Sequence, residues 1–176
     1  KEKMKMRKVL LFALCALMVF AMAATVYAKN GKNGQSGKSN TAHLYLREKD
    51  ANWDIVEDGA WGKMKYNLSG PELCFVFNGH GLEPGVDYCL IYYPDPWPGA
   101  DLICLGTGTG TDLDPLAIPP YPGGDVHIKG CVDTGDLTDA KIWLVLCDDV
   151  DCDSAVMTGW NPTEYLFEHD VITFDD

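Results

Sequence analysis

The sequence predicts an all-β domain, an antiparallel β-sandwich, on three observations. Apolar and polar residues alternate over short segments throughout residues 42–176. Gly, Pro, Asn and Asp separate these segments at intervals of about eight to twelve residues, which is typical of sandwiches. No long segment in this region keeps the period of an α-helix. About nine short strands with this spacing favour two packed antiparallel sheets.

The strands are expected in the following order: 43–47, 53–57, 62–68, 72–78, 86–93, 102–107, 125–132, 141–147, 165–168 and 171–174. Leu44 and Leu46 share one face of the first strand, and Met64 and Tyr66 share one face of the third. The segments 72–78 and 86–93 are apolar throughout, as expected of central strands. A short helical turn is expected near 161–166.

Residues 1–28 have the order of a secretory signal peptide. A basic leader ends at Lys8, the apolar run Val9–Ala24 follows, and small or branched residues precede Ala28. We therefore expect a secreted or cell-surface protein with no membrane association after cleavage. Residues 29–41 are rich in Gly, Asn, Ser and Lys. They are expected to be a flexible linker to the domain at 42–176.

The charge balance limits the classes of partner. The formal net charge is −12, and the sequence shows no basic stripe. Nucleic acid is therefore not an expected partner, because phosphate binding requires clustered Lys or Arg. An extracellular glycan or a surface protein is compatible with this charge. Unpaired edge strands would also allow self-association.

Six cysteines follow the predicted signal peptide: Cys74, Cys89, Cys104, Cys131, Cys147 and Cys152. An even number in an exported chain predicts up to three disulfides, although buried free thiols are the alternative. Cys147 and Cys152 are the most local candidate pair, because only a short acidic loop separates them.

The segment from Gly81 to Tyr88 reads Gly-Leu-Glu-Pro-Gly-Val-Asp-Tyr. It resembles the tyrosine corner of fibronectin type III and related immunoglobulin-like domains, so the sandwich is expected to have immunoglobulin-like character. The resemblance implies that Leu82 packs inward, that Pro84 and Gly85 form a turn, and that the Tyr88 hydroxyl bonds back to the chain. It implies nothing about function.

Four further segments carry a wider resemblance: Gly59–Met64, Phe77–Leu82, Tyr92–Gly99 and Gly159–Tyr165. In these segments the chain is similar to uncharacterised exported single-domain β-sandwich proteins of archaea and bacteria. This resemblance implies export and the fold, and it brings no activity with it.

The acidic loop at 148–153 is a candidate calcium site. Asp149, Asp151 and Asp153 alternate along it and Asp148 precedes them, and calcium prefers several carboxylate oxygens. The loop is not an EF-hand, because it lacks the Gly and the bidentate Glu of that motif. A solvated turn is the alternative interpretation.

The segment Tyr92-Tyr93-Pro94-Asp95-Pro96-Trp97-Pro98 is the candidate ligand-binding loop. Trp97 between two prolines could stack on a sugar ring, with Tyr92 and Tyr93 beside it and Asp95 as a hydrogen-bond acceptor. The alternative is that Trp97 covers an open end of the core, since tryptophans are buried on average.

The sequence contains no nucleophile motif and no metalloprotease motif, so we do not expect an enzyme. Asn67-Leu68-Ser69 is the one glycosylation sequon. The sequence therefore predicts a non-catalytic structural or interaction module, with calcium at residues 148–153 as the candidate stabilising ion. A carbohydrate-binding module that uses Trp97 and the neighbouring tyrosines is the second hypothesis.

Overall fold

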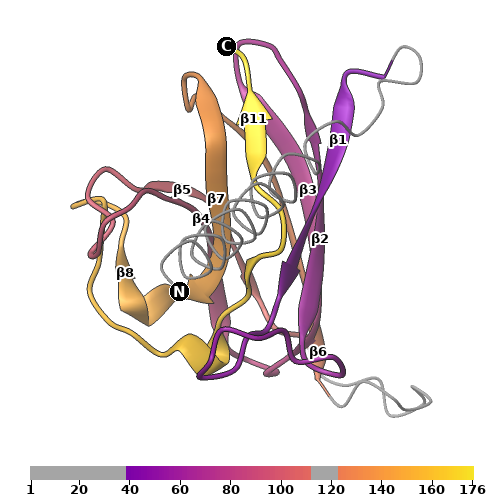
Figure 1. The fold of residues 1–176 in the computed structure, drawn as a ribbon, viewed down its shortest axis with the longest axis vertical. Coiled ribbons are helices and arrows are strands. Elements are labelled where there is room, and N and C mark those ends of the chain that lie inside the picture. The colour runs from indigo at the N-terminus through magenta and orange to yellow at the C-terminus, as the bar shows by residue number, and fades with distance from the viewer. Residues whose placement is uncertain (1–38, 112–122) are drawn as a thin grey trace, which may run out of the picture. The chain divides into compact units, whose positions relative to one another are not determined.

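The computed structural model describes residues 39–111 and 123–176, which form antiparallel β-sheets (Figure 1). The all-β class expected from the sequence is confirmed. The strands are β1 (Thr41–Arg47), β2 (Trp61–Asn67), β3 (Leu73–Leu82), β4 (Asp87–Tyr93), β5 (Ile103–Thr109), β6 (Gly124–Val132), β7 (Leu137–Leu146), β8 (Val150–Asp151), β9 (Val156–Met157), β10 (Phe167–Glu168) and β11 (Ile172–Phe174). Two 3₁₀ turns, η1 (Cys147–Asp149) and η2 (Pro162–Glu164), interrupt them.

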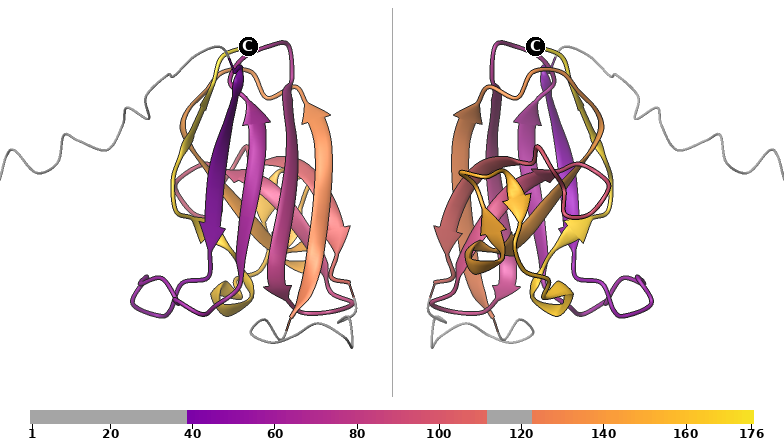
Figure 2. Two further views of the ribbon diagram at one scale, coloured as in Figure 1. Left: turned by 90° about the vertical axis from the view of Figure 1, so that its right-hand side faces the viewer. Right: turned by 90° about the vertical axis from the view of Figure 1, so that its left-hand side faces the viewer.

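The two main sheets have the strand orders β10-β1-β2-β3-β6 and β11-β7-β4-β5. The strands β1, β2 and β3 are sequential neighbours in the larger sheet. The chain then forms the β4–β5 hairpin in the smaller sheet, returns with β6 beside β3, and adds β7 beside β4. Figure 2 shows the larger sheet on one side of the domain and the short β8–β9 hairpin on the other.

The main core lies between these two sheets and consists of alternate residues along each strand. The inward-facing side chains include Leu44, Leu46, Met64, Tyr66, Phe75, Phe77, Leu90, Ile142 and Leu144. The faces predicted for the first and third expected strands are therefore the core faces. Each such side chain contributes about 1.5–3 kcal/mol when it is fully removed from water.

A second buried cluster covers the outer face of the smaller sheet. Ile91 and Tyr93 of β4 pack there with Trp143 and Val145 of β7, and residues from the later loops cover them. Because β4 is buried on both faces, its sequence is apolar without alternation, as a central strand requires.

The prediction of a strand at 53–57 is wrong. This segment belongs to a loop between β1 and β2, in which Ile55 makes only an isolated bridge to Lys49. The carboxylate of Asp50 accepts the backbone N–H groups of Asn52 and Asp54 at 2.8 and 3.0 Å. Such side-chain hydrogen bonds favour a turn over a strand. The helical turn expected near 161–166 is present as η2.

The connection from β3 to β4 crosses between the two sheets and contains the predicted corner. Tyr88 is buried, and its hydroxyl accepts the backbone N–H of Glu83 at 3.1 Å. Leu82 is buried in the main core, and Pro84 and Gly85 form the turn, in which Gly85 has φ 77°. The hydroxyl therefore anchors the connection where it changes sheets.

Tyr88→Phe should lower the free energy of unfolding by about 1 kcal/mol, because the Glu83 N–H loses its acceptor. Urea denaturation measures this loss. Tyr45→Phe is the matched control, because Tyr45 lies on the outer side of β1 and forms no described side-chain hydrogen bond. Equal stability of the two variants would contradict the anchoring role.

All six cysteines after residue 28 are paired, but the expected Cys147–Cys152 bond is wrong. The disulfides are Cys74–Cys131, Cys89–Cys147 and Cys104–Cys152. Cys147 and Cys152 are close in sequence, yet each lies beside a different strand of the smaller sheet. Two disulfides thus attach the segment after β7 to β4 and β5.

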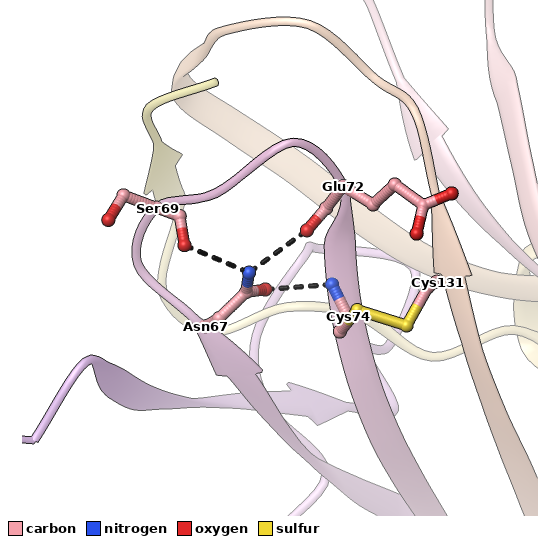
Figure 3. The surroundings of a disulfide bond; sticks show 5 residues. All are labelled: Asn67, Ser69, Glu72, Cys74 and Cys131. Atoms are coloured by element: carbon pink, nitrogen blue, oxygen red, sulfur yellow. Dashed lines mark hydrogen bonds between the residues drawn. A yellow bond between two sulfur atoms is a disulfide. The ribbon is translucent and has the colours of Figure 1, made fainter.

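The remaining disulfide joins β3 to β6 on the outer side of the larger sheet, next to the sequon asparagine (Figure 3). The Asn67 amide donates to the carbonyls of Ser69 and Glu72 at 3.1 and 2.9 Å, and its oxygen accepts the Cys74 N–H at 2.7 Å. Asn67 therefore holds the β2–β3 turn together. A glycan on its nitrogen would replace one of the two donated hydrogens, and glycosylation stays a prediction.

The predicted signal peptide, and the predicted linker up to residue 38, lie outside the described residues. In the ranges 39–111 and 123–176, no helix has the length and apolar character needed to cross a membrane.

Candidate functional site

Three exposed tryptophans from separate loops lie next to one another. Trp53, Trp97 and Trp160 expose 53, 50 and 41% of their surface. Trp160 is central, with its ring centroid 6.2 Å from Trp53 and 5.3 Å from Trp97. We call these three side chains the tryptophan surface. Contiguous exposed aromatic rings of this kind are typical of a binding surface.

The rings of the tryptophan surface do not form one plane. The Trp53 and Trp160 planes are inclined by 38°, and the Trp97 and Trp160 planes by 79°. An edge-to-face pair is a favourable aromatic geometry, so the tilt stabilises the arrangement. The surface therefore presents ring faces in different directions instead of a flat platform.

Buried aromatic residues support this surface from below. Trp143 stacks on Tyr93 with centroids 3.8 Å apart, and Phe167 meets Trp143 and Trp53 edge-on at 5.1 and 5.0 Å. The Trp143 indole N–H also donates to the Glu168 carboxylate. Because Trp143 and Phe167 are almost fully buried, they give the exposed rings a rigid base.

Trp53 is held by the turn around Asp50. Its backbone N–H donates to the Asp50 carbonyl at 3.0 Å, and its backbone is in the left-handed region with φ 67°. Backbone N–H groups of Asp54 and Asn52 stabilise the Asp50 carboxylate and lower its pKa. The Lys49 ammonium lies 5.7 Å from the Trp53 ring centroid, within cation–π range.

Trp160 is positioned by the buried side chain of Asp149. The carboxylate accepts the Tyr165 hydroxyl at 2.6 Å and the Asn161 amide at 2.7 Å, so it fixes residues on the C-terminal side of Trp160. The Asp149 carbonyl accepts the N–H groups of Thr158 and Gly159. Burial, followed by the hydrogen bond to Asp149, raises the pKa of Tyr165 far above its usual range.

Gly159 is required where the loop passes Asp149. A Cβ atom at this position would lie 1.9 Å from the Asp149 carboxylate oxygen. This distance is too short for any residue other than glycine. The loop can therefore approach the carboxylate closely enough for Asn161 and Tyr165 to bond to it. This local requirement explains the Gly that precedes Trp160.

The four predicted ligand-binding residues are separated by the fold. Trp97 joins the tryptophan surface, and Tyr93 lies beneath it against Trp143. Tyr92 points to the opposite side of β4 and packs against the main core. Asp95 accepts a hydrogen bond from Lys141 at 2.5 Å. Trp97 alone of the four is an exposed aromatic side chain, so it does not serve as a buried lid of the core.

The four aspartates of the predicted calcium site do not converge. Asp149 is buried and bonded as described, while Asp151 accepts the N–H groups of Asp153 and Ser154 at 3.0 Å. Asp148 and Asp153 are exposed. In the described part of the chain, the one group of three closely spaced ligand atoms is Glu72, Cys74 and Cys131, whose cysteines form a disulfide. Calcium at 148–153 stays a prediction that requires this loop to rearrange.

Two depressions of about 300 and 560 Å³ lie near the tyrosine corner and share Glu83 and Glu164 in their walls. Tyr88 and Tyr165 also border the smaller one, but their hydroxyls are already hydrogen-bonded. Neither depression contains the exposed indoles. The tryptophan surface is therefore the stronger candidate for ligand binding.

No protein-family model matches the chain, and comparison with curated proteins and with solved structures finds no match. The functional argument therefore depends on the geometry of this chain. Sequence reasoning missed Trp53, which lay in a segment assigned as a strand, and Trp160. Turn-forming residues indicated that both tryptophans are in exposed loops. Asp50 and Asn52 precede Trp53, and Gly159 and Pro162 flank Trp160.

Proposed function

We propose that the protein is a non-catalytic, extracellular carbohydrate-binding module and that the tryptophan surface is its binding site. The contiguity of Trp53, Trp97 and Trp160 is the observation that carries the proposal. Sugar rings have apolar C–H faces that stack on indole rings. Three neighbouring indoles on a rigid base could contact successive sugars with little loss of conformational entropy.

The orientation of the rings favours a class of glycan. A flat crystalline polymer would require coplanar rings, whereas these planes are inclined by 38° and 79°. A soluble chain that twists from one sugar to the next fits inclined rings better. Neutral soluble polysaccharides are therefore the proposed ligand class.

Three disulfides are compatible with an extracellular location, where such glycans occur. The immunoglobulin-like character remains part of the proposal, supported by the Tyr88 corner. The strand order does not support it directly. Three consecutive strands stay in one sheet here, whereas the third strand of an immunoglobulin constant domain belongs to the second sheet.

Trp160→Ala should abolish most of the binding, because Trp160 contacts both other indoles. Retardation in affinity electrophoresis through gels containing soluble xylan, mannan or mixed-linkage glucan provides the measurement. The dissociation constant should rise at least about tenfold, as for a central hot-spot aromatic. Trp97→Ala and Trp53→Ala should each have a smaller effect, because each of these rings contacts Trp160 from one side only.

Trp61→Ala is the matched control, because the ring contacts described for Trp61 on β2 are with His80 and Arg47 and not with the tryptophan surface. It should leave binding unchanged, and thermal unfolding should show that the three surface variants remain folded. If no neutral glycan retards the protein, or if Trp61→Ala weakens binding as much as Trp160→Ala, the proposed site is wrong.

A further inference from the structure

Within residues 39–111 and 123–176, most of the basic side chains lie on the outer face of the larger sheet. The described residues contain six Lys and Arg: Arg47, Lys49, Lys63, Lys65, Lys129 and Lys141. Four of them, Arg47, Lys63, Lys65 and Lys129, lie on strands β1, β2 and β6, at positions that alternate with core residues. We call these four residues the cationic face. These residues form no stripe along the sequence, because only the pairing of the strands places them on one face.

The strand register brings these residues together. Lys65 of β2 is paired with Val76 of β3, and Val76 is paired in turn with Lys129 of β6. On the other side of β2, Lys65 is opposite His43 and Lys63 is opposite Tyr45 of β1. With strands about 4.8 Å apart and about 3.3 Å per residue, four strands and seven residues span roughly 14 by 20 Å. His80 and His127 also face outward on β3 and β6. The side chains thus form one continuous patch.

The cationic face is not neutralised by nearby acids. The described ion pairs are Lys49–Glu168 and Lys141–Asp95, and His80 is hydrogen-bonded to Asp125. None of these contacts involves the four residues of the face. Asp125 is the one carboxylate among the outward-facing residues of β1, β2, β3 and β6. Burial lowers the pKa of His43, and the positive charges of Lys63 and Lys65 lower it further. The cations of the face therefore act on a neighbouring side chain.

Two aromatic rings lie among these charges. The Arg47 guanidinium is 5.9 Å from the Trp61 ring centroid, and the Lys63 ammonium is 5.5 Å from that of Tyr45. Cation–π attraction keeps both cations close to the sheet. The face therefore offers both cations and partly exposed rings.

We propose that the cationic face binds an anionic polysaccharide, one that carries carboxylate or sulfate groups. Arg and Lys bind such groups through charge-assisted hydrogen bonds, and the rings of Trp61 and Tyr45 can contact the sugars between them. Three disulfides fit an oxidising compartment, which favours an extracellular acidic glycan over nucleic acid. A second copy of this chain fits less well, because both copies carry a large negative charge.

This site is independent of the tryptophan surface, and its test uses different probes. Heparin and polygalacturonate supply sulfate and carboxylate groups, dextran is the neutral control, and duplex DNA represents the other class of polyanion. Despite its net negative charge, the folded protein should bind immobilised heparin or polygalacturonate at low salt and not dextran. Binding should weaken as salt rises.

A pair of double variants separates local from overall charge. Lys63→Gln/Lys65→Gln should weaken binding about tenfold, because it removes two cations from the face. Lys49→Gln/Lys141→Gln changes the net charge equally but removes two cations that are paired with Glu168 and Asp95, so it should bind as the parent does. Trp160→Ala should also bind normally.

Three results would overturn the proposal. They are absence of binding to both anionic polysaccharides, equal losses in the two double variants, and tighter binding to duplex DNA than to either polysaccharide. Thermal unfolding of both double variants confirms that they are folded. Failure of Trp160→Ala to change neutral-glycan binding would instead contradict the function proposed for the tryptophan surface alone.

Discussion

Replacing Cys89 and Cys147 with Ala should lower the free energy of unfolding by about 4 kcal/mol. The bond joins residues 58 apart in sequence, and closing a loop of this length removes much of the entropy of the unfolded chain. A loss of this size is a large share of the total stability of a typical domain. Urea denaturation of the double variant measures it.

The Cys74→Ala/Cys131→Ala variant provides a close comparison. Its disulfide joins residues 57 apart, so the chain-entropy argument gives nearly the same loss of stability. The two bonds differ in position, because Cys147 begins the segment that leads through Asp149 to Trp160. Loss of the Cys89–Cys147 bond should therefore weaken neutral-glycan binding in the folded protein, whereas loss of Cys74–Cys131 should not.

Peptide mapping without reduction tests the pairing itself. It should release Cys89 linked to Cys147 and Cys104 linked to Cys152. A Cys147–Cys152 linkage would contradict the fold around the tryptophan surface.

Asp149→Ala should destabilise the protein by about 3 kcal/mol. The substitution leaves the buried Tyr165 hydroxyl and the Asn161 amide without their acceptor, and hydrogen bonds to charged groups contribute about 1.5–3 kcal/mol each. The loop that carries Trp160 should lose its fixed geometry at the same time. Urea denaturation and affinity electrophoresis measure the two effects.

Two controls distinguish this role from general charge effects. Asp148→Ala removes the neighbouring exposed carboxylate and should change stability by no more than about 0.5 kcal/mol. Tyr165→Phe removes only the hydroxyl, so combining it with Asp149→Ala should cost less than the sum of the two single changes. Strict additivity would show that the Tyr165–Asp149 hydrogen bond contributes nothing.

Local sequence patterns predicted the parts of the fold that depend on local physics. Alternation at Leu44, Leu46, Met64 and Tyr66 identified the core face, because side chains in a strand alternate between its two sides. The segment ending at Tyr88 indicated the corner, because its turn and its hydrogen bond lie within a few residues.

The remaining features depend on register and strand order, which alternation does not specify. Cys147 and Cys152 pair with β4 and β5, and proximity along the chain gives no sign of this. Arg47 and Lys129 share one face only because β1, β2, β3 and β6 are neighbours in that order. The tryptophan surface likewise joins three loops, of which the sequence singled out only the one that carries Trp97.

The tryptophan surface is the central claim, and the indole N–H signals in a ¹H–¹⁵N NMR spectrum test it most directly. The chain has five tryptophans and therefore five such signals, which single substitutions assign. Addition of the soluble neutral glycan that retards the protein most should shift the signals of Trp53, Trp97 and Trp160 and leave that of Trp61 in place. If the Trp160 signal does not move, or if only Trp61 responds, the tryptophan surface is not the binding site.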